Sequence, residues 1–432
     1  MYGNKTSRSG YCIHARDPEL RRKTLRTTAI RIAFVGTILA LSCWLQAQTF
    51  TVLHAFNGPP SDGANPFAPL ISDGAGNFYG AAETGGASCC GTIFRLNKSG
   101  EKTLYNFTGG ADGGFPGAGL IRDAAGNLYG TTQHGERSGV GTIFKLSPTG
   151  QLTTLYQFTG GSDGGYPLAS LIRDAAGNFY GTASSGGDLS CNQGIGCGVV
   201  FKLDTTGKET VLYSFNAIGG GQFPVAGLIR DAAGNLYGTT PSGGDTTCNA
   251  PFGCGVVFRL DANGKETVLH KFAGGTADGS FPESGLIRDA HGNLYGTTSE
   301  GGGAGCFGAG CGIVYSVNKN VETILYRFTG SGGDGSYPDA KLYLDAAGNF
   351  YGTTEFGGDT SCNSPFGCGT VFKLDSTGQE TVIHIFNRFT DGGAPIAPLI
   401  ADRAGNLYGT TLNWGPSNCN QYGCGTVFKI AP

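Results

Sequence analysis

Charged side chains are scarce in this sequence. Only 14% of its 432 residues are charged, and the 29 Lys and Arg residues are nearly balanced by 32 Asp and Glu residues. A protein that binds nucleic acid usually carries a cluster of basic residues, because it must neutralise phosphates. We therefore expect no nucleic-acid partner, and the sequence has no acidic tail either.

Long apolar runs are also missing from most of the chain. After residue 47, no stretch approaches the roughly 18 to 20 apolar residues that a membrane-spanning helix needs. Basic residues from Arg21 to Arg31 precede a short apolar run, Ile32–Leu41, which Leu45-Gln46-Ala47 follows. This pattern predicts a signal peptide over residues 1–47 and a mature chain over residues 48–432 without a membrane span.

Variants of this N-terminal signal stay open. Ala40-Leu41-Ser42-Cys43 is an imperfect lipobox that would leave Cys43 lipidated, and Arg21-Arg22 loosely resembles a twin-arginine signal. The segment could also remain uncleaved as an anchor. Each variant leads out of the cytoplasm, so we expect an exported protein in the periplasm, at the cell surface or in the medium.

Glycine, in contrast, is abundant, with 78 residues, and aromatic residues make up 11% of the chain. The segment Asp-x-x-Gly-Asn-(Leu/Phe)-Tyr-Gly recurs seven times, at intervals of 50 to 58 residues. Such intervals are typical of propeller blades and too long for leucine-rich or ankyrin units. The repeated asparagines are Asn77, Asn127, Asn178, Asn235, Asn293, Asn349 and Asn406.

Each repeat predicts four short strands. In the copy at residues 226–272, β-rich runs at 226–229, 236–240, 255–260 and 267–272 are separated by turns and one long loop. We name these runs strands A to D. The turns carry Asp early and Gly late, as tight turns with a final positive φ do. The predicted fold is an all-β, seven-bladed propeller of four-stranded blades.

One aromatic residue recurs in each of strands B, C and D of nearly every repeat. Strand B has a Tyr such as Tyr237, strand C an aromatic such as Phe258, and strand D ends on a Phe such as Phe272. Each ring buries about 150 to 250 Å², so we expect these residues to form the core between blades.

The two ends of the chain suggest how the ring closes. The last repeat stops after strand C at residues 425–430, whereas residues 51–56 match strand D and precede the first strand A. Pairing of these segments would remove an exposed sheet edge. We therefore predict that the N-terminal strand completes the last blade.

The repeated blocks also resemble a known family. Asp-Ala-Ala-Gly-Asn-Leu-Tyr-Gly-Thr-Thr and Gly-Thr-Val-Phe-Lys-Leu are similar to the GloVer-type tandem repeats of exported bacterial proteins, whose surface anchors vary. The resemblance covers nearly all of the mature chain. It implies an extracellular or cell-surface repeat protein and carries over no catalytic residue. Because the sequence stops two residues after its last predicted strand, we expect no C-terminal anchor.

Most cysteines occur as local pairs in the loop between strands B and C. Disulfides are the leading interpretation and indicate an oxidising compartment, because a structural zinc site needs four ligands and each loop offers two thiols. Adjacent Cys89 and Cys90 could form a vicinal bridge or remain free thiols. The predicted pairs are Cys191–Cys197, Cys248–Cys254, Cys306–Cys311, Cys362–Cys368 and Cys419–Cys424.

The loops from B to C and from D to A should emerge on one face of the propeller. Exposed aromatics there could bind a glycan or a protein, and the alternative is that they pack under their own loops. Our candidate ligand-binding residues are Phe252, Phe366, Trp414 and Tyr422. A second set, placed before prolines, is expected mainly to pack: Phe115, Tyr166, Phe223, Phe281 and Tyr337.

Polar residues that break the repeat are the candidates for catalysis. His54, His270 and His384 stand where other repeats have Tyr and look like strand substitutions, while His134 beside Glu136 is a weak acid-base pair. Arginines at the end of strand A are expected to pair with turn aspartates. They are Arg122, Arg173, Arg230 and Arg288.

Aspartates of the D to A loops could suggest calcium, but one carboxylate per loop is too few, and turn formation is favoured. These residues are Asp62, Asp112, Asp163, Asp278, Asp334 and Asp391.

The sequence names no catalytic residue, metal or cofactor. We expect a monomeric binding module for a glycan or protein ligand. An extracellular enzyme acting on polysaccharide or lactone, and a purely structural surface protein, are the alternatives.

Overall fold

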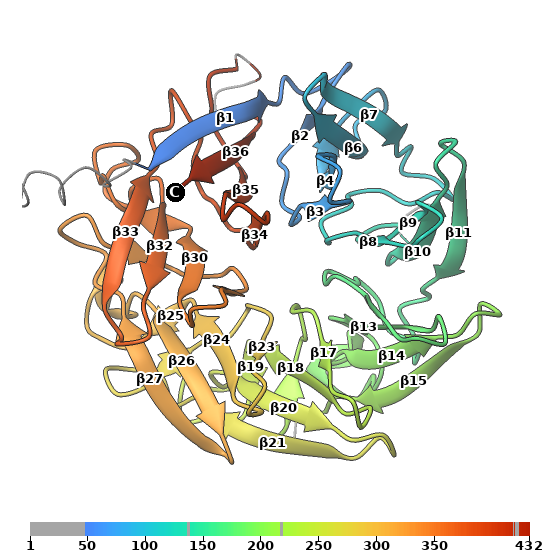
Figure 1. Cartoon of the computed structure of the whole chain (residues 1–432). Coiled ribbons are helices and arrows are strands. Elements are labelled where there is room, and N and C mark those ends of the chain that lie inside the picture. The colour runs from blue at the N-terminus through green and yellow to red at the C-terminus, as the bar shows by residue number, and fades with distance from the viewer. Residues whose placement is uncertain (1–47, 136–138, 217–218, 418, 420–422) are drawn as a thin grey trace, which may run out of the picture. The chain divides into compact units, whose positions relative to one another are not determined.

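The computed structural model describes residues 48–432 except 136–138, 217–218, 418 and 420–422. Across these residues, seven four-stranded antiparallel sheets are arranged around a centre as the blades of a β-propeller (Figure 1). The predicted fold class is confirmed. The predicted signal peptide and Cys43 lie outside the described residues. In the described part of the chain, no helix has the length and apolar character needed to cross a bilayer.

The blades follow one another along the chain, and strand A of each lies innermost (Figure 1). The first three blades, from A to D, consist of β3 (Ile71–Ser72), β4 (Phe78–Ala82), β6 (Thr92–Asn97) and β7 (Gly100–Asn106); β8 (Ile121–Arg122), β9 (Leu128–Thr132), β10 (Thr142–Leu146) and β11 (Leu152–Gln157); and β12 (Ile172–Arg173), β13 (Phe179–Ala183), β14 (Val199–Leu203) and β15 (Glu209–Ser214).

The remaining four blades repeat this order. They consist of β17 (Ile229–Arg230), β18 (Leu236–Thr240), β20 (Val256–Leu260) and β21 (Glu266–Lys271); β23 (Ile287–Arg288), β24 (Leu294–Thr298), β26 (Ile313–Asn318) and β27 (Val321–Arg327); β29 (Tyr343–Leu344), β30 (Phe350–Thr354), β32 (Thr370–Leu374) and β33 (Glu380–Ile385); and β34 (Ile400–Ala401), β35 (Leu407–Thr411), β36 (Thr426–Ala431) and β1 (Thr49–Ala55).

The seventh blade joins the two ends of the described chain. Its outermost strand is β1, which pairs antiparallel with β36, with Phe50 opposite Ile430 and Ala55 opposite Thr426. Figure 1 shows the blue β1 beside the dark red β36. The residue after β1 is also bonded at the seam, since the Phe56 N–H donates to the Gly425 carbonyl at 3.1 Å.

Strand A is shorter than the sequence predicts. Each strand A has only two paired residues, such as Ile229 and Arg230 of β17. The preceding residues, here 226–228, are not paired with strand B, whose residues 238–240 pair with strand C alone. These segments instead line the central cavity described below.

The repeated Asp-x-x-Gly-Asn-(Leu/Phe)-Tyr motif is a hydrogen-bonded turn. In the second blade, the Asn127 side-chain amide donates to Asp123 at 2.8 Å and the Tyr129 hydroxyl donates to the same carboxylate at 2.9 Å. Gly126 has a φ of 84°, which only glycine adopts without strain. The motif therefore fixes the A to B turn and anchors the strand B tyrosine to it.

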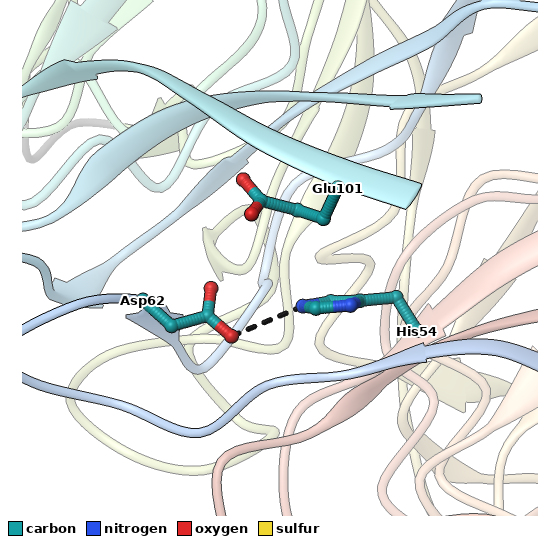
Figure 2. Close-up of side chains that lie close together, drawn as sticks. All are labelled: His54, Asp62 and Glu101. Carbon is teal, nitrogen blue, oxygen red and sulfur yellow. Dashed lines mark hydrogen bonds and ion pairs between the residues drawn. The ribbon is translucent and has the colours of Figure 1, made fainter. Parts of the chain in front are cut away.

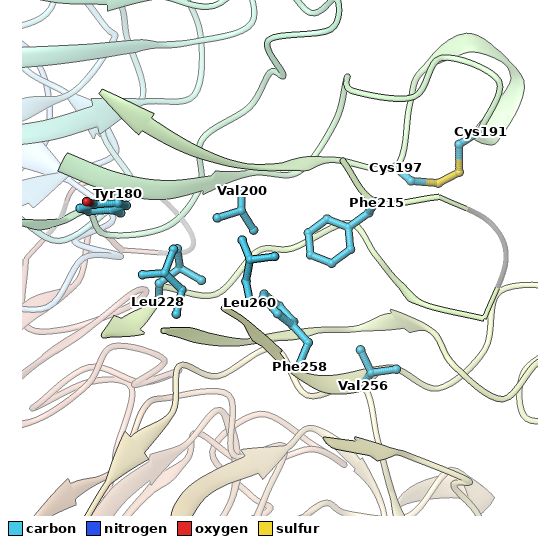
Figure 3. Packing of buried hydrophobic residues seen from close by; sticks show 10 residues of the cluster. Tyr180, Cys191, Cys197, Val200, Phe215, Leu228, Val256, Phe258 and Leu260 are labelled. Atoms are coloured by element: carbon cyan, nitrogen blue, oxygen red, sulfur yellow. A yellow bond between two sulfur atoms is a disulfide. The ribbon is translucent and has the colours of Figure 1, made fainter. Parts of the chain in front are cut away.

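Aromatic pairs hold neighbouring blades together, as predicted. The Phe at the end of each strand D contacts the strand C aromatic of the next blade, with ring centroids 5.0–5.3 Å apart and planes at 65–75°. Edge-to-face rings at this distance attract one another. Figure 3 shows one boundary, where Phe215 meets Phe258 beside Val200 and Leu260. Seven such clusters occur in the described chain, one at each blade boundary.

A β-bulge recurs in strand D of every blade. The register between strands C and D shifts at the strand C aromatic, for example between Val200 and Phe201 opposite β15. The same shift occurs in the other six blades. A bulge re-aims the side chains that follow it. It therefore sets the direction of the His or Tyr that lies near the end of strand D.

Candidate functional site

One face of the propeller carries both long loops of every blade, as predicted. Each D to A loop pairs with the B to C loop of the blade it enters. Four of these pairings are short two-stranded ladders, and three are single bridges such as Gly165 with Ser185. The ladders are β2 (Gly63–Ala64) with β5 (Thr84–Gly85), β16 (Gly221–Gln222) with β19 (Ser242–Gly243), β22 (Gly279–Ser280) with β25 (Glu300–Gly301), and β28 (Gly335–Ser336) with β31 (Phe356–Gly357).

The cysteine pairs stiffen this face. The sulfurs of each predicted pair adjoin, and the Cα atoms are 5.2–5.8 Å apart, within the range of disulfides. Cys89 and Cys90 also adjoin as a vicinal pair with a Cα separation of 3.8 Å. Two cysteine loops contain a 3-10 turn, η3 (Asn192–Gly194) and η4 (Cys306–Gly308).

The candidate aromatics occupy different environments. Phe252 and Phe366 are 50% and 44% exposed at loop tips. Trp414 is instead half-buried and packs against the core between the sixth and seventh blades. Tyr422 lies outside the described residues.

Phe366 belongs to a row of four rings. Phe307, which is 77% exposed, contacts Phe366 at a centroid distance of 5.5 Å, and Phe366 contacts Phe356 at 5.6 Å. Phe356 in turn contacts the half-buried Tyr337 at 5.6 Å. The row thus runs across the fifth and sixth blades, from an exposed cysteine loop to the D to A loop that enters the sixth blade.

A cavity on the propeller axis adjoins the inner end of the row, where Tyr337 lies near the Glu355 and Asp339 carboxyl groups. Residues at and before each strand A, with Gln133, Glu355 and Leu412 after three of the strands B, line a volume of about 1150 Å³. On the side of the fifth and sixth blades, the cavity is lined by Glu283, Asp339, Lys341 and Glu355. Asp339 follows Tyr337 by two residues and Glu355 precedes Phe356, so these carboxyl groups and the aromatic row share one stretch of the loop face.

Asp339 and Glu355 form a coupled carboxyl pair. They share a hydrogen bond, which requires one of them to be protonated, and Asp339 Oδ1 is a buried atom with no hydrogen-bond partner among the described residues. Burial, with the Glu355 and Glu283 carboxylates, raises the pKa of Asp339 well above its usual value. Burial raises the pKa of Glu355 to about 7, and it lowers the pKa of Lys341.

Our sequence analysis missed Phe307, Phe356 and these cavity residues, although the repeat contains a signal for them. The position after the D to A proline holds Glu283 and Asp339 in the fifth and sixth repeats, and apolar or small residues in the other five. Those five are Phe67, Gly117, Leu168, Val225 and Ile396. Aligning the repeats for polar substitutions at strand A would have identified the site.

Histidines of strand D contact the loop aspartates at the outer edge of the blades. His54 Nε2 lies 3.1 Å from Asp62 Oδ2, with Glu101 of the next blade close by (Figure 2). Tyr105 donates to Asp112 in the same way, so His and Tyr are interchangeable here, as predicted. The loop aspartates also accept backbone N–H groups of their own loops, which supports the turn-forming role.

The strand A arginines do not form the predicted ion pairs among the described residues. Each guanidinium lies over the strand B tyrosine of the preceding blade, for example Arg122 over Tyr79 at 5.7 Å and Arg230 over Tyr180 at 5.5 Å. The turn aspartates are already occupied by Asn and Tyr donors, which is why the arginines turn to the adjacent ring. The contact between arginine and the tyrosine ring of the preceding blade thus replaces the predicted ion pair with the turn aspartate.

The remaining histidines of the described chain, His134 and His291, contact neighbouring side chains in loops and turns. The His134 ring contacts Phe115 and Tyr166 at 5.2 and 5.7 Å, and its supposed partner Glu136 lies outside the described residues. His291, which replaces an alanine of the repeated turn, is exposed, and its Nδ1 lies 3.8 Å from Asp289 Oδ2.

The Gloeobacter/Verrucomicrobia repeat matches this chain three times, at residues 33–252, 191–366 and 246–432. The chain belongs to this repeat family. As a Gloeobacter/Verrucomicrobia repeat protein, it carries its sequence motifs on propeller blades. No curated protein matches the sequence.

Solved structures similar to this repeat protein are propellers of low sequence identity. The extracellular domain of a protein described as a hybrid two-component system from B. thetaiotaomicron is 12% identical with a TM-score of 0.53; the match covers 89% of this chain and 41% of that chain. A gluconolactonase from Xanthomonas campestris is 16% identical (TM-score 0.39, covering 71% and 82%). The calcium-binding protein regucalcin from Agrobacterium tumefaciens is 15% identical (TM-score 0.40, covering 72% and 88%). At such identities these likenesses concern the fold alone.

Proposed function

We propose that this repeat protein binds glycans outside the cytoplasm, at a site on the fifth and sixth blades. The observation that carries the proposal is the continuity between the aromatic row and the carboxyl groups of the cavity. Sugars present apolar C–H faces and many hydroxyl groups. Exposed aromatic rings can pack against the C–H faces, and carboxylates can accept hydrogen bonds from the hydroxyl groups.

The placement of the rings supports a carbohydrate chain as the ligand. Phe307 and Phe366 are exposed, whereas Phe356 and Tyr337 are half-buried and lead toward the cavity. An extended chain could therefore lie over the loop tips and reach Asp339 with one end. An exported location is supported by the paired cysteines, which persist in oxidising compartments.

The test is binding of the full chain to an array of immobilised glycans. The double variant Phe307→Ala/Phe366→Ala should weaken binding at least about tenfold, because it removes both exposed rings of the row. Phe389→Ala is the control, since it removes an exposed phenylalanine that has no described ring contact to the row and is not among the candidate ligand-binding residues. An equal loss of glycan binding in both variants, or no glycan bound by the wild type, would contradict the proposal. If the wild type binds a protein and no glycan, the result would favour the protein-ligand alternative.

A second candidate function, hydrolysis of the bound ligand, is favoured by one observation. Asp339 and Glu355 share a hydrogen bond beside an open cavity, and a carboxyl pair of this kind can supply an acid and a base, as the paired aspartates of aspartic proteases do. Asp339→Asn and Glu355→Gln should each abolish turnover of a glycan that the protein still binds. Unchanged turnover in both variants would exclude these residues as acid and base.

A further inference from the structure

The outer edge of the propeller carries a second cluster of polar side chains, far along each blade from strand A. At two blade boundaries, the strand D histidine, the following loop aspartate and a glutamate of the next strand D come together. One cluster is His54, Asp62 and Glu101 (Figure 2), and the other is His270, Asp278 and Glu322. In each, one nitrogen and two carboxylate oxygens lie within 4.8 Å of one another.

The other boundaries lack one or two members of this set in the described chain. Tyr takes the place of His beside Asp163 and Glu209, and beside Asp334 and Glu380. Leu152 takes the place of the glutamate between the first and second blades. The equivalent positions therefore provide natural versions of the boundary without the full donor set.

The sixth boundary is an informative comparison. His384 lies 2.8 Å from Asp391, an ordinary hydrogen bond, and stacks on Phe50, which replaces the glutamate. In the two complete clusters, the corresponding Nε2 to Oδ2 distances are longer, at 3.1 and 3.3 Å. Two ligands of one tetrahedral ion with bonds of about 2.0–2.1 Å are separated by roughly 3.3 Å.

One carboxylate oxygen in the second cluster also lacks a partner. Glu322 Oε1 is a buried atom without a hydrogen-bond partner among the described residues, as are Glu209 Oε1 and Glu380 Oε1 at the boundaries with tyrosine, whereas Glu101 Oε1 of the first cluster accepts from the Thr103 hydroxyl. The Asp278 carboxylate, in contrast, is fixed by the backbone N–H groups of Ala273 and Gly279 at 2.8 and 2.7 Å. Such outer hydrogen bonds orient a metal-binding carboxylate. The cluster thus has one rigid ligand, one imidazole and one oxygen still to be satisfied.

We propose that these two clusters each bind a divalent first-row transition metal ion, with Zn²⁺ as the reference ion. One imidazole and two carboxylates form a nitrogen and oxygen set that suits zinc and its neighbours rather than calcium, which prefers oxygen alone. The histidine side chains are 18% and 17% exposed, so solvent reaches the donors and a water can complete the coordination.

Each ion would connect two blades. In the first cluster, His54 belongs to β1 of the seventh blade and Glu101 to β7 of the first blade, so the ion would fasten the seam strand to its neighbour. The second cluster would join β21 to β27. A ligand that binds only the folded chain stabilises it, so the metal should raise the resistance to unfolding.

The experiment uses the full chain, freed of metal with a chelator, and titrates Zn²⁺ by calorimetry. Wild-type protein should bind two equivalents, and His54→Tyr or His270→Tyr should each bind one. The double variant should bind none, or at least about 100-fold more weakly. Tyrosine is the native residue at this position in other blades, so these variants keep the hydrogen bond to aspartate and should fold normally.

His384→Tyr is the control, because it removes a histidine from a boundary without the glutamate. It should leave two equivalents bound. Thermal melting gives a second readout: Zn²⁺ should raise the transition of the wild type and not that of the double variant, while the two match without metal. Two equivalents retained by the double variant, or none bound by a wild type that folds normally, would overturn the proposal.

Discussion

Tyr315 provides a direct test of how the aromatic pairs stabilise the ring. It is fully buried in β26, and its hydroxyl has no hydrogen-bond partner among the described residues. The six other blades have Phe at this position. An unpaired buried hydroxyl costs about 1–3 kcal/mol, whereas the ring contact with Phe272 at 5.0 Å does not depend on it. Tyr315→Phe should therefore stabilise the protein by about 1–2 kcal/mol.

The measurement is urea unfolding, with the midpoint compared at unchanged slope. The reciprocal variant Phe258→Tyr places a hydroxyl at the same position of the fourth blade, where Phe258 is fully buried, and should be destabilising by a similar amount. If Tyr315→Phe destabilises instead, the hydroxyl is bonded in the folded protein. Opposite signs for the two variants are the expected result.

Three further predictions concern the blades and their loops. Phe215→Ala should destabilise the protein by about 3–5 kcal/mol in the same assay, because it empties the boundary against Phe258; an effect below 1 kcal/mol would mean that the boundary collapses around the gap. Burial and, after it, the Asp163 and Asp334 carboxylates raise the pKa values of Glu209 and Glu380 to about 7, so the folded state holds these protons more tightly than the unfolded state. The contribution of these two groups to the free energy of unfolding should be greatest below pH 4.5 and should fall by roughly 1 kcal/mol each, after solvent screening, as the pH rises through 7. Urea unfolding at pH 5 and pH 8 measures this loss of stability, and the double variant Glu209→Gln/Glu380→Gln should reduce it. Finally, peptide mapping of the unreduced protein should find five bridges within loops, whereas bridges between blades would contradict the local pairing.

The architecture was predictable because the residues that form it are repeated. Tyr in strand B and aromatics in strands C and D recur at fixed intervals, and each contacts the same neighbour in every blade. The length of strand A was not predictable from its apolar residues. Apolar side chains suit both a paired strand and an unpaired cavity lining, so the sequence pattern alone does not decide between them.

The contacts between blades were predictable only in part. The sequence places Arg230 next to Asp231, and a local pair is the simplest interpretation. The carboxylate is instead bonded to Asn235 and Tyr237 in the same turn, and the arginine reaches the ring of Tyr180 one blade away. Such a contact joins residues 50 positions apart and needs the curvature of the ring, which local sequence does not contain.

A binding site on a repeat ring requires that the repeats differ. Seven equal blades would present the same group seven times around the axis, and no single place would be favoured for a ligand. The positions that vary here are those that carry little of the core. Glu283, Asp339 and Lys341 line the cavity rather than a blade boundary, so a polar side chain there replaces no core contact. Because these substitutions fall on two adjacent blades, which also carry the aromatic row, the charged departures from the repeat along the cavity define one site, as binding of a single ligand requires.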